Sequence, residues 1–275
     1  MARKRPSHQA NALVTGAGSG IGRAFAREIA ARGGRVVVSD INPQSAQETV
    51  HLIGEDKAHA VVADVADLAQ VETLASEAEA WLGKPVNLLV NNAGVGVGGA
   101  PTGEIPYADW QWALGINLWG VVHGCHVFAP KLRALGHGGI INVCSTASFA
   151  AGPNMGPYNV SKAAALALSE TLSAEFAGSG VHVTALCPTW VQSNIATSGR
   201  ITGPSQNLAE KLIRKGMPPE RVVREALDAL DANRLYVMPQ LDAKLIWRAK
   251  RLWPNTYRHG LGLIARYGER LLARQ

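Results

Sequence analysis

The chain has 275 residues, of which 47% are hydrophobic and 17% are charged. This composition is typical of a folded globular protein and excludes an extended disordered chain, and the length suits one sizeable core better than two. The formal net charge of +6 is uneven, because eight Lys or Arg and a single acid lie between Lys244 and Arg274. The rest of the chain is close to neutral, which argues against a nucleic-acid-binding protein.

The three cysteines, Cys125, Cys144 and Cys187, form no CxxC pair and no Cys/His cluster. The sequence therefore predicts neither a disulfide framework nor a metal site, and the expected compartment is the reducing cytoplasm. The basic, polar N-terminus lacks the apolar stretch of a signal peptide, and no apolar run is long enough to span a bilayer. We expect a cytoplasmic protein that at most rests on a membrane surface.

Short apolar, β-branched segments alternate with longer segments of helical periodicity along most of the chain. The predicted strands cover residues 12–15, 35–39, 58–63, 87–91, 139–144, 181–186 and 235–238. The predicted helices cover residues 20–32, 43–53, 67–82, 107–134, 157–178 and 218–231. This alternation predicts an α/β fold, a doubly wound (Rossmann-type) parallel sheet of about seven strands with helices on both faces. We expect a single domain over residues 1–275, with its core at residues 11–238.

A glycine-rich segment follows the first predicted strand and opens a helix, reading TGAGSGIG over residues 15–22. Glycines allow a tight turn and a close approach to a pyrophosphate, which the N–H groups at a helix N-terminus stabilise. The spacing TGxxxGxG is more restricted than the common GxGxxG, and the alternative is a glycine-rich turn that binds no ligand. The candidate cofactor-binding residues here are Gly16, Gly18, Ser19, Gly20, Ile21 and Gly22.

Asp40 follows the second predicted strand, about twenty residues after the glycines. A carboxylate there accepts hydrogen bonds from the adenosine ribose and repels a 2′-phosphate, so it favours NAD over NADP. Asp40 also suits a second role, as the cap of the helix that starts near Pro43. After the third strand, Asp64 is placed to bind an adenine edge. The other candidate cofactor contacts after strands two to four are Ile41, Val65, Asn91, Ala93 and Gly94.

Tyr158 and Lys162 are four residues apart in a predicted helix, so both side chains lie on one face. A free tyrosine titrates near pKa 10, and an ammonium group beside it favours the phenolate. Tyr158 can then give a proton to a carbonyl oxygen or take one from an alcohol. Ser145, which follows the fifth strand, is placed to hold the same oxygen. A YxxxK spacing alone also fits an exposed surface pair, but its position in a cofactor-type sheet argues against that alternative.

Together these motifs resemble the single-domain form of the short-chain dehydrogenase/reductase family. The motifs occur in family order: TGxxxGIG at 15–22, the acid at 40, NNAG at 91–94, Asn117, Ser145, and YxxxK at 158–162. The resemblance implies that Tyr158 is the general acid/base and that Ser145 polarises the substrate oxygen. It implies that Lys162 binds the nicotinamide ribose and lowers the tyrosine pKa.

The resemblance also implies that Asn117 supports a water that relays protons to Lys162, although an ordinary polar helix residue is the alternative. After the sixth strand, where the family usually has Pro-Gly and then a Thr, the chain reads PTWVQS over residues 188–193. Thr189 replaces the glycine, and Ser193 keeps a hydroxyl for the nicotinamide carboxamide. The resemblance thus adds four cofactor-binding candidates: Pro188, Thr189, Val191 and Ser193.

Three segments, 95–101, 146–155 and 190–217, are the candidate walls of a substrate pocket. Their candidate substrate residues are Val97, Phe149, Met155, Trp190 and Ile195. Because these are apolar, the expected substrate is lipophilic; the alternative is that the side chains only pack the lid. Residues 190–217 are predicted to form a mobile loop that closes over substrate.

The tail, residues 240–275, mixes apolar and basic side chains and is predicted to be helical. One interpretation is an extension that packs over the pocket or on a neighbouring subunit. The other is an amphipathic anchor on anionic lipid, which would give peripheral membrane contact.

The sequence therefore predicts an NAD-dependent oxidoreductase that interconverts a secondary alcohol and a ketone. The resemblance implies a homodimer or homotetramer formed through the helices at 107–134 and 157–178. Two alternatives stay open: an NADPH-dependent carbonyl reductase of the same fold, and a catalytically silent dinucleotide-binding regulator. The presence of Asn117, Ser145, Tyr158 and Lys162 favours an enzyme.

Overall fold

The computed structural model describes residues 5–272, so the predictions for residues 1–4 and 273–275 lie outside the described range. A central sheet contains seven strands in the order β3-β2-β1-β4-β6-β7-β9, and every neighbouring pair is parallel. The strands are β1 (Asn11–Thr15), β2 (Arg35–Asp40), β3 (Ala58–Val62), β4 (Leu88–Asn91), β6 (Gly138–Val143), β7 (Val181–Leu186) and β9 (Tyr236–Val237). The predicted doubly wound sheet is confirmed, with each strand within about two residues of its expected place.

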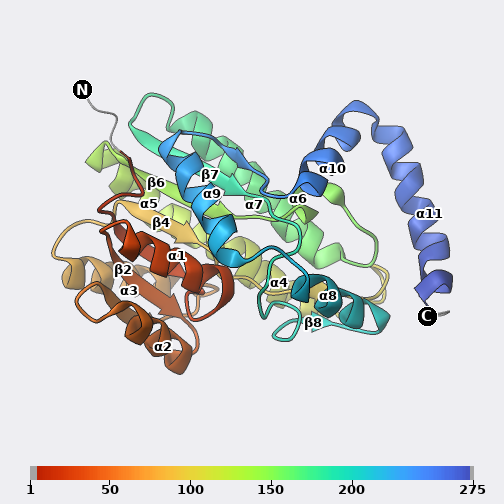
Figure 1. Cartoon of the computed structure of the whole chain (residues 1–275), viewed down its shortest axis with the longest axis horizontal. Helices are drawn as coiled ribbons and strands as arrows, with labels where there is room; N and C mark the ends of the chain where they lie inside the picture. Colours follow the sequence, from red (N-terminus) through yellow and green to blue (C-terminus); the bar gives the residue numbers. More distant parts are fainter. Residues whose placement is uncertain (1–4, 273–275) are drawn as a thin grey trace.

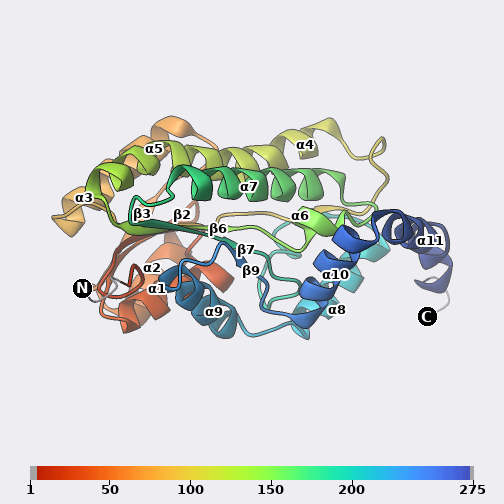
Figure 2. The ribbon, with the colours of Figure 1, turned by 90° about the horizontal axis from the view of Figure 1, so that it is seen from above.

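Helices cover both faces of the sheet (Figure 2). One layer contains α1 (Gly20–Ala31), α2 (Pro43–Ile53) and α9 (Pro219–Asp231), and the other contains α3 (Leu68–Leu82), α4 (Tyr107–Leu114), α5 (Gly120–Leu135) and α7 (Gly156–Glu175). Each strand feeds both cores, because alternate side chains point to opposite faces. In β1, Ala12 and Val14 pack under the first layer, whereas Leu13 packs under the second.

The structure adds elements that the periodicity of the sequence did not reveal. The helix expected over residues 107–134 is interrupted by a π-turn, η1 (Gly115–Trp119), between α4 and α5. The loop expected over 190–217 contains a short strand, β8 (Arg200–Ile201), and a helix, α8 (Pro204–Arg214). β8 pairs with β5 (Val97–Gly98), so two of the three expected pocket walls are joined by backbone hydrogen bonds.

The tail is helical as predicted, with α10 (Leu241–Leu252) and α11 (Pro254–Leu272). Both helices lie at the end of the molecule where the strands finish, beside the short helix α6 (Ala147–Ala150), and α11 leads away from the body (Figure 1). Among the described residues, none of the helices combines the length and the apolar character needed to cross a bilayer.

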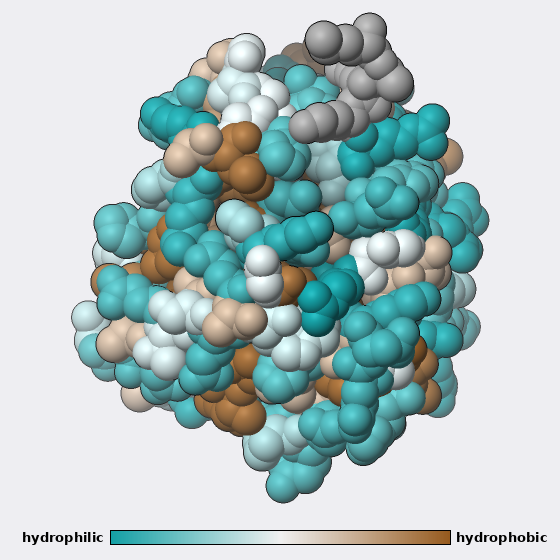
Figure 3. All heavy atoms as spheres, turned by 90° about the vertical axis from the view of Figure 1, so that its left-hand side faces the viewer, coloured by the Kyte–Doolittle hydropathy of each residue, from teal (hydrophilic) through white to brown (hydrophobic). Residues whose placement is uncertain are grey.

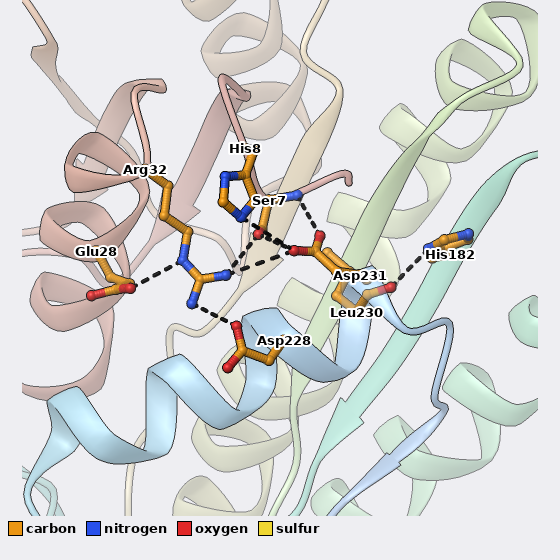
Figure 4. Close-up of polar contacts among 8 residues, drawn as sticks. All are labelled: Ser7, His8, Glu28, Arg32, His182, Asp228, Leu230 and Asp231. Atoms are coloured by element: carbon orange, nitrogen blue, oxygen red, sulfur yellow. Dashed lines mark hydrogen bonds and ion pairs between the residues drawn. The ribbon is translucent and has the colours of Figure 1, made fainter. Parts of the chain in front are cut away.

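A polar cluster closes the opposite end of the sheet (Figure 4). The guanidinium of Arg32 binds Glu28 at 3.0 Å and Asp228 at 2.8 Å, and it donates to the Ser7 hydroxyl at 2.8 Å. Asp231 accepts hydrogen bonds from the backbone N–H and the hydroxyl of Ser7. Because Arg32 and Asp231 are largely buried, each charge needs its partners to offset the loss of hydration. The cluster holds the N-terminal segment against the C-terminal ends of α1 and α9.

Candidate active site

The glycine-rich turn packs too closely for side chains at its key positions. Gly16 and Gly20 adopt the left-handed region, with φ of +60° and +51°. A Cβ at Gly22 would overlap the Gly16 carbonyl oxygen, and one at Gly16 would lie 2.7 Å from Ala93 Cα. The turn is therefore a cradle whose shape depends on glycine.

Two residues that were not predicted hold this cradle against the segment after β4. The Thr15 hydroxyl accepts from the backbone N–H groups of Asn92 at 3.0 Å and Ala93 at 3.2 Å. The Asn92 side-chain amide donates to the carbonyl oxygens of Thr15 at 2.8 Å and Gly16 at 3.0 Å. Thr15 belongs to the TGxxxGIG motif and Asn92 to the NNAG motif, so the two motifs contained the information needed to predict these contacts.

The N-terminus of α1 suits an anion. Its N-cap residue, Ser19, makes no side-chain cap hydrogen bond, so the first N–H groups of the helix keep their donor capacity. A Cβ at Gly20 would lie 3.2 Å from Ser193 Cβ, which places Ser193 directly against this turn. The cradle, the helix N-terminus and Ser193 together fit the pyrophosphate and nicotinamide end of a dinucleotide.

Asp40 lies beside the same cradle. Its carboxylate accepts from Gly18 N–H at 2.9 Å and from Asn42 N–H at 3.0 Å. The cap of α2 is Asn42, which accepts from Ser45 N–H at 3.0 Å, so the alternative role of Asp40 as helix cap is not what the structure shows. Asp40 instead joins the glycine turn to the loop after β2, where Ile41 is exposed.

Arg23 is a basic group close to Asp40 in the cradle, and it is already paired. It bonds Glu48 at 2.7 Å, the Thr49 hydroxyl at 3.0 Å and the Gly18 carbonyl oxygen. Its hydrogen bond and charge lower the pKa of Glu48, so this acid stays ionised beside it.

The candidate cofactor residues after β3 and at the end of β4 already have partners within the chain. Asp64 accepts from Ala66 N–H at 2.9 Å, and the carbonyl oxygen of buried Val65 contacts His123 Nδ1 at 2.9 Å. Asn91 is buried and donates to Asn142 at 2.8 Å, so it fixes the backbone of β4 against β6.

Ser145, Tyr158 and Lys162 come together where β6 meets α7. Lys162 is buried, and its Nζ donates to the Val143 carbonyl oxygen at 2.8 Å. The same Nζ lies 6.0 Å from the centre of the Tyr158 ring. The Ser145 hydroxyl accepts from Ala147 N–H at 3.1 Å, and it lies close enough to the Tyr158 phenol to lower its pKa. The YxxxK spacing therefore does not belong to an exposed surface pair.

Burial sets the protonation of this group in the free protein. It raises the pKa of Tyr158, and the nearby Ser145 hydroxyl only partly opposes this. It lowers the pKa of Lys162, because an ammonium loses hydration there. Lys162 was expected to lower the pKa of Tyr158. In the free protein burial raises this pKa instead, and Lys162 Nζ bonds the Val143 carbonyl oxygen and not the phenol.

Asn117 lies in the π-turn η1 and is fully buried. Its side chain accepts from Val95 N–H at 2.8 Å and donates to the Val95 carbonyl oxygen at 2.9 Å. A Cβ at Gly94 would lie 3.1 Å from Asn117 Oδ1 and 3.3 Å from Lys162 Nζ. Asn117 therefore fixes the segment after β4 next to Lys162, and π-turns of this kind often mark functional sites.

The five candidate substrate residues do not form one wall. Val97 and Phe149 are buried in separate apolar clusters, and Ile195 packs against α8. Met155 lies against the backbone of Gly98, and Trp190 is partly exposed. Between the segment after β7 and α8 lies a cavity of about 650 Å³, lined by Gln192, Ser193, Ala196, Thr197, Asn207, Glu210, Lys211, Ile213 and Arg214.

The tail reaches the segment that carries Pro188 and Thr189. Thr189 donates from its N–H to Gln240 at 3.2 Å and from its hydroxyl to Asp242 at 3.1 Å. Gln240 also donates to the Trp190 carbonyl oxygen at 3.1 Å. The threonine that replaces the usual glycine is thus used to attach α10. The sequence held no signal for this contact, because the partners are about fifty residues apart.

Comparison with known proteins agrees with this geometry. Residues 10–202 match the family model described as short chain dehydrogenase. The chain therefore belongs to the short-chain dehydrogenase family, which confirms the resemblance noted from its motifs and places it among the dehydrogenases and reductases.

Two curated relatives show the range of this similarity. The chain is 33% identical over 258 residues to "Probable oxidoreductase EphD" of Mycobacterium tuberculosis, with 89% of this chain and 43% of that protein covered. It thus spans less than half the length of this relative. It is 37% identical over 207 residues to D-threitol dehydrogenase of Mycolicibacterium smegmatis, with coverage of 74% and 78%.

Solved structures with either dinucleotide are similar to the chain. A short-chain dehydrogenase/reductase from Burkholderia phymatum in complex with NAD has a TM-score of 0.84 at 33% identity, covering 90% of this chain and 94% of that one. A short-chain dehydrogenase from Sphingobium yanoikuyae in complex with NADPH has a TM-score of 0.74 at 26% identity, with coverage of 91% and 94%.

Proposed function

We propose that the chain catalyses the reversible, NAD-dependent oxidation of a secondary alcohol to a ketone. A lipophilic substrate is proposed from Met155, Trp190 and Ile195, which keep part of their apolar surface exposed, whereas Val97 and Phe149 are buried. The observation that carries the proposal is the meeting of Ser145, Tyr158 and Lys162 beside the glycine cradle. We assign residues 11–238 to the catalytic core of a single domain, with residues 240–275 as its extension, in a cytoplasmic protein.

The bound dinucleotide supplies the hydride acceptor. Tyr158 and Ser145 bind the substrate oxygen, and Tyr158 takes the hydroxyl proton as the alcohol is oxidised, or returns it in reduction. Lys162 holds the nicotinamide ribose, and its charge favours the phenolate once the site is filled. Asn117 keeps the Gly94–Val95 backbone in place beside Lys162 and supports a water that passes the proton on. Ser193 and the turn at Gly20 hold the nicotinamide end.

Asp40 supports NAD rather than NADP as the cofactor. Its carboxylate is held at the cradle by two backbone N–H groups, in position to accept from the ribose hydroxyls. A 2′-phosphate would meet this charge, while Arg23 is occupied by Glu48. The proposed adenosine side is completed by Asp64, Ile41 and Val65.

We expect the Asp40→Ala variant to lose about tenfold or more in NADH affinity while gaining affinity for NADPH, because charged hydrogen bonds are lost and a repulsion is relieved. Titrations following nicotinamide fluorescence measure both affinities, and NAD⁺ reduction by a series of lipophilic secondary alcohols measures turnover. Glu55→Ala, which removes an exposed acid after α2, is the matched control. Tighter binding of NADPH by the unaltered protein would contradict the NAD assignment and favour the carbonyl reductase. Dinucleotide binding without any turnover would favour the silent regulator.

We also propose a homo-oligomer formed through α5 and α7. An apolar groove of about 320 Å³ lies between these helices, lined by Val122, Cys125, His126, Ala129, Pro130, Leu168 and Leu172. Trp119, the last residue of η1 before α5, and Val160, near the start of α7, are exposed. Such a groove between two helices is an unpartnered surface that a second copy can cover.

Leu168→Glu should therefore shift the chain from dimer or tetramer to monomer, because it places a charge in this groove. Light scattering of the purified protein measures the mass, with Leu208→Glu on α8 as the control. A monomeric unaltered protein would show that the groove is not an interface.

A further inference from the structure

The exposed side of α10 has an unusual composition. Leu241, Leu245 and Leu252 are 55% to 69% exposed, and their spacing places them on one face of the helix. The opposite face is used for packing, since Ala243 is buried and Trp247 lies 6.0 Å from the Tyr236 ring. The leucines are therefore not core residues of the described chain.

Basic side chains lie on the same exposed side. Lys244 and Arg248 stand between the leucines and are exposed, and Trp253 follows at 62% exposure. The nearby acid, Asp242, is held by the Thr189 hydroxyl. We define the tail face as Leu241, Lys244, Leu245, Arg248, Leu252 and Trp253.

The second tail helix extends this character away from the body (Figure 1). Ile264 and Tyr267 are exposed and lie three residues apart on one side of α11, and Arg266 is exposed on the same helix. The opposite end of the molecule, around α2 and α3, is mainly hydrophilic with small separate apolar spots (Figure 3). Exposed apolar side chains mixed with cations thus characterise the tail end.

We propose that the tail face docks on an anionic lipid surface. Leucine and tryptophan side chains enter the boundary between headgroups and acyl chains, while the longer Lys244 and Arg248 side chains reach the lipid phosphates. A second copy fits this face less well, because a two-fold axis would bring Lys244 and Arg248 against the same cations of the other copy. Anionic headgroups have the complementary charge.

Docking would place the lipid beside the proposed active site. Gln240 and Asp242 attach the start of α10 to Thr189, and the Tyr257 hydroxyl of α11 donates to the Ala150 carbonyl oxygen at 2.8 Å. These contacts join the tail to the two segments that flank Ser145. A lipophilic alcohol dissolved in the bilayer would then enter directly, a step that rests on the function proposed above.

Vesicle flotation with the whole chain tests the docking. We expect the protein to float with vesicles of phosphatidylglycerol and phosphatidylcholine at low salt, and at least about tenfold less with phosphatidylcholine alone, because each cation near an anionic surface adds to binding. The double variant Leu245→Glu/Leu252→Glu should lose flotation. Leu52→Glu, which replaces an equally exposed leucine on α2, should keep it.

Three outcomes would overturn the proposal. They are failure of the unaltered protein to float with anionic vesicles at low salt, equal flotation of the double variant and Leu52→Glu, and binding to both vesicle types alike. If the double variant instead lowers the mass in light scattering, the face is an interface between copies. Oxidation of a lipophilic secondary alcohol dissolved with a little organic cosolvent, without vesicles, should be the same in all three proteins, so its absence would count against the proposed function and not against lipid docking.

Discussion

Replacement of Tyr158 by phenylalanine is expected to lower kcat/KM for alcohol oxidation by roughly 10²–10⁴-fold, the usual contribution of a positioned acid/base. The variant keeps the ring beside Lys162 and removes only the hydroxyl, whose pKa Ser145 lowers. NADH affinity and thermal stability should change little, because the cradle around Gly16 and Gly20 does not involve this hydroxyl.

The pH dependence follows from the direction of the tyrosine pKa. Burial raises the pKa of Tyr158, so the phenol is protonated at neutral pH in the free protein. Oxidation needs the phenolate, and its rate should therefore rise with pH, by up to about tenfold per pH unit below the apparent pKa of the complex. Ketone reduction needs the phenol, and its rate should fall only above that pKa.

Steady-state kinetics across pH in both directions measures these effects. Tyr107→Phe is the matched control, because Tyr107 is exposed at the start of α4 and lies outside the site. If Tyr158→Phe keeps more than about a tenth of the activity, or shows the same rise with pH, another group moves the proton.

The sheet could be predicted because its buried strands appear in the sequence as short, continuous apolar segments. In β1 and β2, runs such as Ala12–Val14 and Val36–Val38 are buried on both faces, so continuous apolar segments bounded by glycine and polar residues locate them. The short pair β5 and β8 carries no such signal. Each is two residues long, and the pairing of Val97 with Arg200 depends on how the chain returns over the site.

The break in the helix near Asn117 could not be predicted from periodicity, because the helical spacing of apolar residues continues from α4 into α5. At the break, the N–H and carbonyl oxygen of Val95, a residue of another segment, both bond the Asn117 side chain. Local propensity cannot contain that information. The same holds for Thr189, whose hydroxyl, absent from a glycine, bonds Asp242.

The motifs predicted which residues belong to the candidate site, but not how deeply they are buried or what their side chains contact. Ser145, Tyr158 and Lys162 were expected together and lie together. The sequence could not show that burial would raise the Tyr158 pKa, since that depends on the depth of the site. It also could not show that Val97 and Phe149 pack in separate clusters instead of lining one wall.

Gly22→Ala is expected to weaken NADH binding by roughly 10–100-fold, because forcing a methyl group into a filled space costs about 1–3 kcal/mol. The new Cβ would overlap the Gly16 carbonyl oxygen, which is backbone and cannot rotate away. Alanine favours the helix by up to about 1 kcal/mol over glycine, which offsets part of this cost but does not remove the overlap. Helix α1 must then move from the turn, and its N–H groups lose their aim at the pyrophosphate.

Gly262→Ala separates this steric effect from helix propensity. Gly262 is also helical, in α11, but a Cβ there has nothing within 4 Å, so NADH binding should be unchanged and stability equal or slightly higher. If Gly22→Ala does not fold, Gly18→Ala tests the same cradle, since its Cβ would lie 2.7 Å from Ser45 Cβ and 2.8 Å from Asp40 Oδ2. Fluorescence titration with NADH gives the affinities, and thermal unfolding gives the stability. Wild-type affinity in a folded Gly22→Ala variant would show that the dinucleotide does not bind at this turn, because the new Cβ displaces the backbone of the cradle. Wild-type affinity in Gly18→Ala, whose Cβ meets the Ser45 and Asp40 side chains, would show that the position of the Asp40 carboxylate does not affect binding.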